Sequence, residues 1–355
     1  MKSIFLLSLI AVVSCITTSV IAEDIATETS VSSASNPIEI LLLTALPASG
    51  KSEVRRYLSS LSAEECLSQF GIGETVQLDD FPYVFIMSRI SKELVARGEE
   101  GMFYLSPALP FRNPKDWGTL IQLVNEDYED LVSSNKPSPE SAAEWMFDRI
   151  DSARLKVGAE PALNLLSDDI RKELLLALEE DACAFLEKKN AGIPESLAGK
   201  TVVIEFARGG AESSTMPLPA PFGYKYSLSQ LSDNILDKAS LLYIWVDPAE
   251  SRRKNLARAN PNDPGSILNH CVPQAVMYGD YGVDDIAWLL ETSNIANTIC
   301  VKKGDVVYNI PLGRFDNRID KTTFVHTPVE EWNKSDVAGL RAGLEEAFAP
   351  LTGNR

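Results

Sequence analysis

The stretch that decides the fold runs from Ile38 to Leu58 and reads IEILLLTALPASGKSEVRRYL. Six of the seven residues from Ile38 to Thr44 are apolar or β-branched, which is typical of a buried central strand in a parallel sheet. A loop of small residues follows, and Glu53 to Leu58 has the composition of a helix. The stretch therefore predicts a strand, a turn and a helix in direct succession.

The loop between this strand and helix is suited to bind phosphate. Backbone N–H groups at the start of a helix have no partner and carry about half a positive charge, so they attract anions. Gly50 lets the backbone come close to such a ligand, Lys51 would reach the terminal phosphates of a nucleotide, and Ser52 would offer its hydroxyl to Mg²⁺. The alternative is an ordinary strand-to-helix turn that happens to contain Gly-Lys-Ser.

This loop resembles the P-loop of nucleotide-binding proteins. Gly50, Lys51 and Ser52 match the end of that motif, whereas its expected first glycine is Ala45. Alanine disfavours positive φ, so we expect a different turn there or a lower affinity. The resemblance implies that the nucleotide is bound by Ala45, Leu46, Pro47, Ala48, Ser49, Gly50, Lys51 and Ser52.

A second predicted strand, Thr75 to Asp80, ends in two aspartates. In open parallel sheets the ligand crevice lies at the carboxyl ends of the strands, which would put Asp79 and Asp80 near the phosphates. In kinases that act on small hydroxyl substrates, an acid at this point binds or deprotonates the acceptor, and the resemblance assigns that role to Asp80. If the strand persists, Asp79 points the other way. The alternative is a pair of helix-capping aspartates.

A third predicted strand, Thr201 to Phe206, contains an acid near its end, Glu205. Apolar and β-branched residues followed by a carboxylate resemble the Walker B pattern, in which the acid helps to hold Mg²⁺ directly or through water. The resemblance therefore makes Glu205 a metal ligand together with Ser52. Aspartate is more usual at this position.

A basic helix is predicted over 249–259, directly after the strand Leu241 to Val246. The order of strand, Asp-Pro and clustered arginines resembles the lid of small-molecule and nucleotide kinases, where arginines stabilise the phosphoryl group in flight. This resemblance implies catalytic roles for Arg252, Arg253 and Arg258. The alternative is a solvated helix face.

Taken together, these motifs resemble the kinase branch of the P-loop nucleoside triphosphatases. The resemblance implies an α/β fold over residues 37–349, with a parallel-sheet P-loop core in three αβα layers and an inserted helical subdomain at about 116–190. It also implies transfer of the γ-phosphoryl group of ATP or GTP, with Mg²⁺, to a small-molecule acceptor that the sequence does not identify. The alternative is a non-catalytic nucleotide-binding protein or an exported scaffold with a degenerate loop, which Ala45 and the leader described next favour.

The first 22 residues differ from the rest of the chain. A lysine, an apolar run and the small-residue site Val20-Ile21-Ala22 indicate a signal peptide and a secretory, periplasmic or organellar destination. Two alternatives stay open: a lipid-attachment box ending at Cys15, and an uncleaved anchor. Only in those two cases would the chain contact a membrane. Residues 23–36, rich in Ser, Thr and Ala, are expected to be a disordered spacer.

Charge and cysteine content narrow the partners. The net charge of −17 opposes general binding to nucleic acid or to an anionic membrane, but it does not oppose a local basic pocket. Cys66, Cys183, Cys271 and Cys300 form no pair at zinc-ligand spacing. Their redox state is left open, since both disulfides and buried free thiols fit.

Overall fold

The computed structural model describes residues 36–258 and 271–353. The expected leader over 1–22 and all but the last residue of the spacer over 23–36 lie outside the described residues, as does most of the loop expected over 260–272. Six strands form one sheet in the order β2-β3-β1-β4-β6-β5. Their bounds are β1 Ile40–Ala45, β2 Glu74–Asp79, β3 Lys200–Phe206, β4 Ala239–Trp245, β5 Thr298–Lys303 and β6 Val306–Asp316.

The sheet is parallel except at one edge. β1 lies at its centre and pairs in parallel with β3 on one side and β4 on the other, while β2 and β6 extend the parallel sheet. β5 is antiparallel to β6. The expectation of an α/β fold with a parallel sheet is therefore confirmed, with this hairpin as an exception. Its reason is the tight turn at Gly304, because so short a connection can only join antiparallel neighbours.

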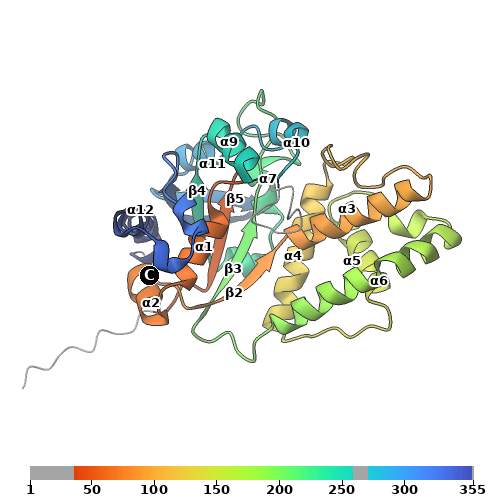
Figure 1. The fold of residues 1–355 in the computed structure, drawn as a ribbon, viewed down its shortest axis with the longest axis horizontal. Helices are drawn as coiled ribbons and strands as arrows, with labels where there is room; N and C mark the ends of the chain where they lie inside the picture. Colours follow the sequence, from red (N-terminus) through yellow and green to blue (C-terminus); the bar gives the residue numbers. More distant parts are fainter. Residues whose placement is uncertain (1–35, 259–270, 354–355) are drawn as a thin grey trace, which may run out of the picture. The chain divides into compact units, whose positions relative to one another are not determined.

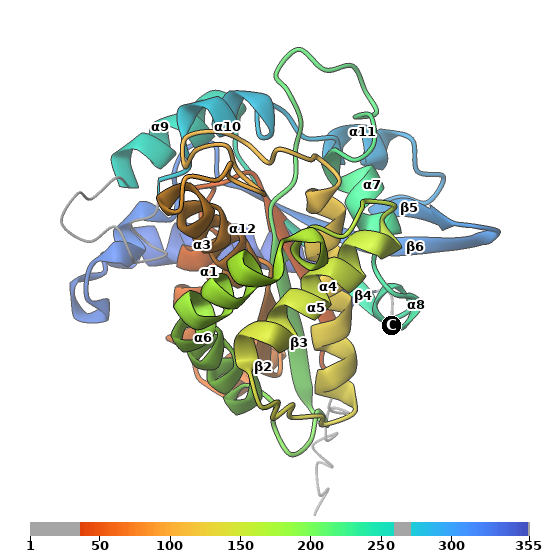
Figure 2. The same ribbon diagram turned by 90° about the vertical axis from the view of Figure 1, so that its right-hand side faces the viewer.

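Helices cover both faces of the sheet (Figures 1 and 2). Along β1, Ile40 and Leu42 face one apolar cluster, and Leu41 and Leu43 face the other. This explains why β1 is apolar at nearly every position. One face is covered by α1 Lys51–Ser59, α2 Ala63–Phe70 and α12 Lys334–Thr352, and the other by α4 Asp116–Val132, α7 Gly223–Ser229, α8 Asp233–Leu236 and α11 Ile286–Glu291.

A second helical layer lies beyond the β2 edge of the sheet (Figure 1). It contains α3 Phe81–Ala96, α5 Ala142–Lys156 and α6 Asp168–Ala191, which pack around a third apolar cluster. α4 belongs to both parts, because Ile121 and Val124 face the sheet while Leu120 and Leu123 face the third cluster. The helical character expected between residues 116 and 189 is confirmed. Ser167 begins α6 as predicted, with its side chain accepting from Ile170 N–H.

The remaining helices lie at the carboxyl end of the sheet or at the surface. They are α9 Pro248–Arg258 and α10 Gln274–Gly279, with short 3₁₀ turns at Leu163–Leu165, Thr323–His326 and Val329–Glu331. In the part of the chain that the structure describes, every helix is too short or too polar to cross a bilayer. The four cysteines in that part are free thiols.

Helix α12 approaches β6 so closely that only glycine fits at position 313. A Cβ atom added there would lie 1.8 Å from the carbonyl oxygen of Ala347, so the backbone of the helix would have to move. We expect Gly313→Ala to lower the free energy of unfolding by roughly 3 kcal/mol, measured by urea denaturation.

The matched control is Gly339→Ala in the same helix, where an added Cβ meets nothing within 4 Å. Helix propensity should make that variant more stable, by about 1 kcal/mol at most. Equal effects of the two substitutions would contradict the close packing of α12 on β6.

Candidate functional site

The loop from Ala45 to Ser52 leaves the carboxyl end of the central strand. Ala45 is still part of β1 and pairs with Ile244, so the turn expected at this position begins later. The positive φ angles fall at Ala48 (57°) and Gly50 (111°). Alanine is strained in this region, whereas a Cβ at Gly50 would lie 2.8 Å from both Asn317 Nδ2 and Thr322 Oγ1.

Three carbonyl groups of the loop are held from outside. The Tyr224 hydroxyl donates to Ala45 O (2.9 Å), and Ser251 Oγ donates to Pro47 O (2.7 Å). Asn317 Nδ2 donates to Ser49 O (2.7 Å). In a trans peptide the N–H points opposite to the C=O, so these bonds turn the N–H groups of the next residues to the other side.

Five consecutive backbone N–H groups at the end of this loop have no acceptor among the described residues. Among the described residues, nothing accepts from the backbone N–H of Ala48, Ser49, Gly50, Lys51 or Ser52. Unpaired N–H groups in the first turn of a helix form an anion site. The loop therefore presents a row of donors to one side.

Lys51 lies beside these donors with its ammonium group buried. Its side chain is 11% exposed, and Nζ lies 4.0 Å from Glu205 Oε1, the nearest carboxylate recorded for it. Burial lowers the pKa of Lys51, and Arg258 adds to this effect, although Glu205, Asp79 and Asp80 oppose it. The ammonium is thus close to acids but bonded to none of them, which leaves it able to contact an anion.

Glu205 is shared between Lys51 and a residue that the sequence analysis missed. Arg55 Nη1 donates to Glu205 Oε2 at 2.8 Å, while Oε1 makes no hydrogen bond within the described residues. Arg55 lies one helical turn after Lys51, so the i,i+4 spacing was the signal that would have found it. The pairing of β3 with β1 brings Glu205 level with Leu43, at the base of the loop.

Glu53 connects the loop to two distant segments. Its Oε1 accepts from Arg258 Nη2 (2.7 Å) and lies 2.8 Å from His326 Nε2. Burial alone would raise the pKa of Glu53, but the bond to His326 and the charge of Arg258 lower it to about 2. Arg258 is thereby fixed close enough to Lys51 to influence its pKa.

The other two predicted arginines lie elsewhere on α9. Arg252 bonds to Glu212 (3.0 Å) and lies over the ring of Tyr278. Arg253 is exposed and bonds to Glu250. The structure therefore brings Arg258, but neither Arg252 nor Arg253, into the surroundings of Lys51.

Asp79 and Asp80 both lie within electrostatic reach of Lys51. The strand ends at Asp79 and does not persist through Asp80, so the alternation of faces does not apply. Asp79 Oδ1 accepts from Phe81 N–H (2.8 Å), the capping role considered as an alternative. Burial raises the pKa of Asp79, and the neighbouring Glu205 and Asp80 add to the shift.

Asp80 has a cationic partner, Arg208, that lies two residues after the end of β3. Arg208 Nη1 donates to Asp80 Oδ2 at 2.7 Å, and the Arg208 side chain is 2% exposed. Burial raises the pKa of Asp80, although Arg208 and Lys51 oppose the shift. Oδ1 accepts no hydrogen bond from the described residues, so one oxygen of this carboxylate is free to accept a proton or a hydrogen bond.

The two oxygen ligands expected for Mg²⁺ fit a hard divalent cation. The Ser52 hydroxyl and Glu205 Oε1 make no hydrogen bond within the described residues. Ser52 lies in the first turn of α1, and Glu205 lies beside Lys51. No group of three or more His, Cys, Asp or Glu residues in the described part of the chain is arranged to hold a metal. Mg²⁺ bound with a nucleotide needs only one or two protein ligands, because phosphates and water supply the rest.

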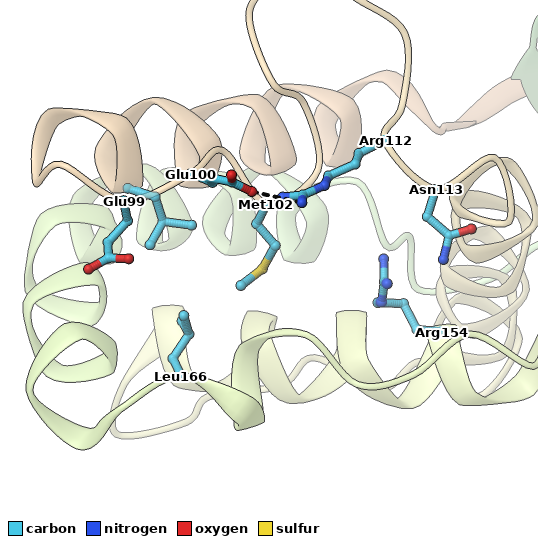
Figure 3. A pocket seen from close by; sticks show the side chains of 8 residues that line it. Glu99, Glu100, Met102, Arg112, Asn113, Arg154 and Leu166 are labelled. Atoms are coloured by element: carbon cyan, nitrogen blue, oxygen red, sulfur yellow. Dashed lines mark hydrogen bonds and ion pairs between the residues drawn. The ribbon is translucent and has the colours of Figure 1, made fainter.

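A surface hollow is lined by residues none of which belongs to this loop (Figure 3). It has a volume of about 630 Å³ and is lined by Leu94, Glu99, Glu100, Met102, Arg112, Asn113, Arg154 and Leu166. Both of its arginines are paired, Arg112 with Glu100 and Arg154 with Asp116. Its lining includes none of the groups around Lys51, so we place the candidate site at the loop rather than in this hollow.

Comparisons with known proteins add no name to this geometry. Neither a scan of protein-family models nor a search of curated proteins gives a match. The chemistry of the site therefore has to be argued from its own residues.

Asp280, which the sequence analysis missed, is a buried carboxylate beside this site. Its Oδ2 accepts from Trp117 Nε1 at 3.2 Å, and it is 6% exposed. Burial raises its pKa to about 6, although the Trp117 bond opposes the shift. Because the folded pKa exceeds the unfolded value of about 3.9, ionisation costs stability as the pH rises from about 4 to 6.

We expect Asp280→Asn to stabilise the protein at pH 7 by about 2 kcal/mol, since asparagine keeps an acceptor for Trp117 without the charge. The gain should vanish at pH 4, where the carboxyl is protonated in the folded state. Urea denaturation at both pH values measures this difference.

Asp316→Asn is the control of opposite sign, because its hydrogen bonds with Arg318 lower the pKa of Asp316 to about 2. That variant should lose stability at pH 7. A destabilised Asp280→Asn protein at pH 7 would contradict the cost assigned to the Asp280 charge.

Proposed function

We propose that this protein is a P-loop kinase, which binds a nucleoside triphosphate at Ala45–Ser52 and transfers its γ-phosphoryl group to a small acceptor. The observation that carries the proposal is the buried Lys51 ammonium, which makes no hydrogen bond with any described residue and lies beside a row of N–H groups that have no acceptor among those residues. A buried cation is costly unless it is paired. A triphosphate would supply the missing anion. In this proposal the sheet is the P-loop core and α4 to α6 are the helical insertion that borders the acceptor.

The chain's own residues would divide the work of phosphoryl transfer. The loop N–H groups and Lys51 would hold the phosphates, and Arg258, oriented by Glu53, would face charge that develops on the transferred group. Ser52 and Glu205 would hold Mg²⁺, which when bound with the nucleotide neutralises part of the phosphate charge. Asp80 Oδ1 would take the proton of the acceptor hydroxyl.

A second candidate is a nucleotide-binding protein without catalysis. Each arginine of α9 is bonded to a glutamate: Arg252 to Glu212, Arg253 to Glu250 and Arg258 to Glu53. In that state none of them is free to follow a moving phosphoryl group. This candidate would be favoured if the protein binds nucleotide but transfers phosphate to none of the acceptors tested.

The phosphate-binding role of Lys51 is tested by Lys51→Met, which keeps the length of the side chain and removes its charge. Loss of a charge-assisted contact should weaken binding of a non-hydrolysable ATP analogue with Mg²⁺ by roughly 10- to 1000-fold. Isothermal titration calorimetry measures the affinity.

Lys238→Met is the matched control. Lys238 precedes β4 at the amino end of the sheet, where it pairs with Glu39 at 2.8 Å, and its loss should leave the affinity unchanged. Wild-type affinity in Lys51→Met would reject the nucleotide site at this loop.

The difference between the arginines of α9 gives another expectation. Arg258→Ala should lower turnover by roughly 100-fold or more while nucleotide affinity changes much less, because developing charge is stabilised chiefly in the transition state. Steady-state kinetics and titration of the nucleotide separate the two effects. Arg253→Ala, which removes an exposed arginine of the same helix, should retain wild-type turnover, and equal losses in the two variants would refute this assignment.

A further inference from the structure

Four polar groups near Asp80 make no hydrogen bond within the described residues. Arg208 Nε is buried without a hydrogen bond partner. The hydroxyl groups of Tyr104 and Tyr281 make no hydrogen bond within the described residues, although Tyr281 is 8% exposed. The second oxygen of Asp280 also accepts none from those residues. Arg208 Nε is the fully buried one of the four, and buried polar groups are nearly always satisfied. A ligand that bound at this group would give Arg208 Nε the acceptor that it lacks.

These residues come from three separate segments, since Asp280 and Tyr281 are adjacent, but they influence one another electrostatically. The pKa of Tyr104 is raised by burial first and then by Tyr281, Asp116, Asp280 and Asp80. The pKa of Tyr281 is likewise raised by burial, with Asp80 and Asp280 contributing and Arg208 opposing. Trp117 connects the set, because its indole donates to Asp280 and its ring lies 5.5 Å from that of Tyr281.

Arg208, Asp80 and Asp280 together carry a net charge that is negative, or zero when one carboxyl group is protonated. Among the described cations, Arg208 is the one that influences the pKa of Tyr281, and its Nη1 already donates to Asp80. No described cation influences the pKa of Asp280, and Asp116 is paired with Arg154. A phosphate monoester bound here would bring about two further negative charges next to two carboxylates, with no unpaired cation to receive them.

Building on the proposed kinase function, we propose that Asp280, Tyr104 and Tyr281 form an acceptor subsite for an uncharged alcohol with at least two hydroxyl groups. One hydroxyl donates to Asp80, and a second donates to Asp280, while the tyrosines and Arg208 Nε bond to the remaining oxygens. A substrate with a phosphate group at this position is rejected by the two carboxylates. Asp280 is then a residue that determines acceptor specificity.

In the transfer step the oxygen of the hydroxyl at Asp80 forms a bond to the γ-phosphorus of the nucleotide. The bond from that phosphorus to the β,γ-bridging oxygen breaks, and the electron pair leaves with the nucleoside diphosphate. The hydroxyl proton passes to Asp80. Asp280 holds the second hydroxyl and exchanges no proton, so it orients the acceptor without joining the chemistry.

The first experiment gives the full-length protein Mg-ATP and three matched pairs of acceptors: ribose and ribose 5-phosphate, uridine and uridine monophosphate, glycerol and glycerol 3-phosphate. ADP release measures the rate, and ³¹P NMR identifies the product. We expect transfer to at least one uncharged member, with its phosphorylated partner at least roughly 100-fold poorer in kcat/KM.

The second experiment compares Asp280→Asn with Asp284→Asn for the accepted alcohol. Asp280→Asn should raise KM roughly 10- to 100-fold with little change in kcat or nucleotide affinity. The ratio of kcat/KM for the uncharged alcohol to kcat/KM for its phosphorylated partner should also fall, because one repelling charge is gone. Asp284, another burial-shifted aspartate, bonds instead to the Tyr243 hydroxyl (2.6 Å), and its variant should leave KM and the preference unchanged.

The outcomes separate this inference from the function on which it rests. If the protein fails to bind a non-hydrolysable ATP analogue, the kinase proposal fails first. If it binds the analogue but prefers phosphorylated acceptors, or transfers to no uncharged member of the set, the subsite as proposed is wrong and the nucleotide site stands. If Asp280→Asn prefers the uncharged alcohol over its phosphorylated partner as strongly as the wild type does, Asp280 does not determine acceptor specificity.

Discussion

The rest of the site depends on the burial of the Lys51 ammonium among acids that do not bond to it. Desolvation disfavours this charge, and Glu205 at 4.0 Å offsets only part of the cost. Arg55 competes for the same carboxylate and holds it at 2.8 Å. The protein thus keeps a positive charge with an unused capacity for hydrogen bonds at the start of a helix that directly follows the central strand.

The loop is held by contacts that are remote in sequence. The donors that hold the loop carbonyls, Tyr224, Ser251 and Asn317, are 179, 204 and 268 residues from their acceptors. Each comes from a segment that packs at the carboxyl end of the sheet. Because these bonds fix the orientation of three peptide groups, the direction of their N–H groups is a property of the whole fold and not of the loop alone.

This dependence also shows what the sequence could predict. β1, β3 and β4 were found because a strand buried on both faces is a nearly unbroken apolar run, and α6 because Ser167 caps a strong periodic stripe. α2 was missed although Ser62 and Glu65 form a capping box, which is a readable signal. The loop, Lys51 and Glu205 followed from local patterns, and Arg258 from its cluster. Asn317, Tyr224 and Arg208 carry no local signal, because their roles arise only when distant segments meet.

The two sides of the site differ in how their charges are balanced. On the side of the loop, Lys51, Arg55 and Arg258 oppose Glu205 and Glu53, and unpaired N–H groups add further positive potential. Beyond Asp80, Arg208 pairs with Asp80, and Asp280 is a buried carboxylate that has no cationic partner among the described residues. In a chain with a net charge of −17, three cations are thus concentrated around the loop. Because a buried carboxylate that costs stability is rarely kept for packing, the acidic side is best explained by a ligand that donates hydrogen bonds.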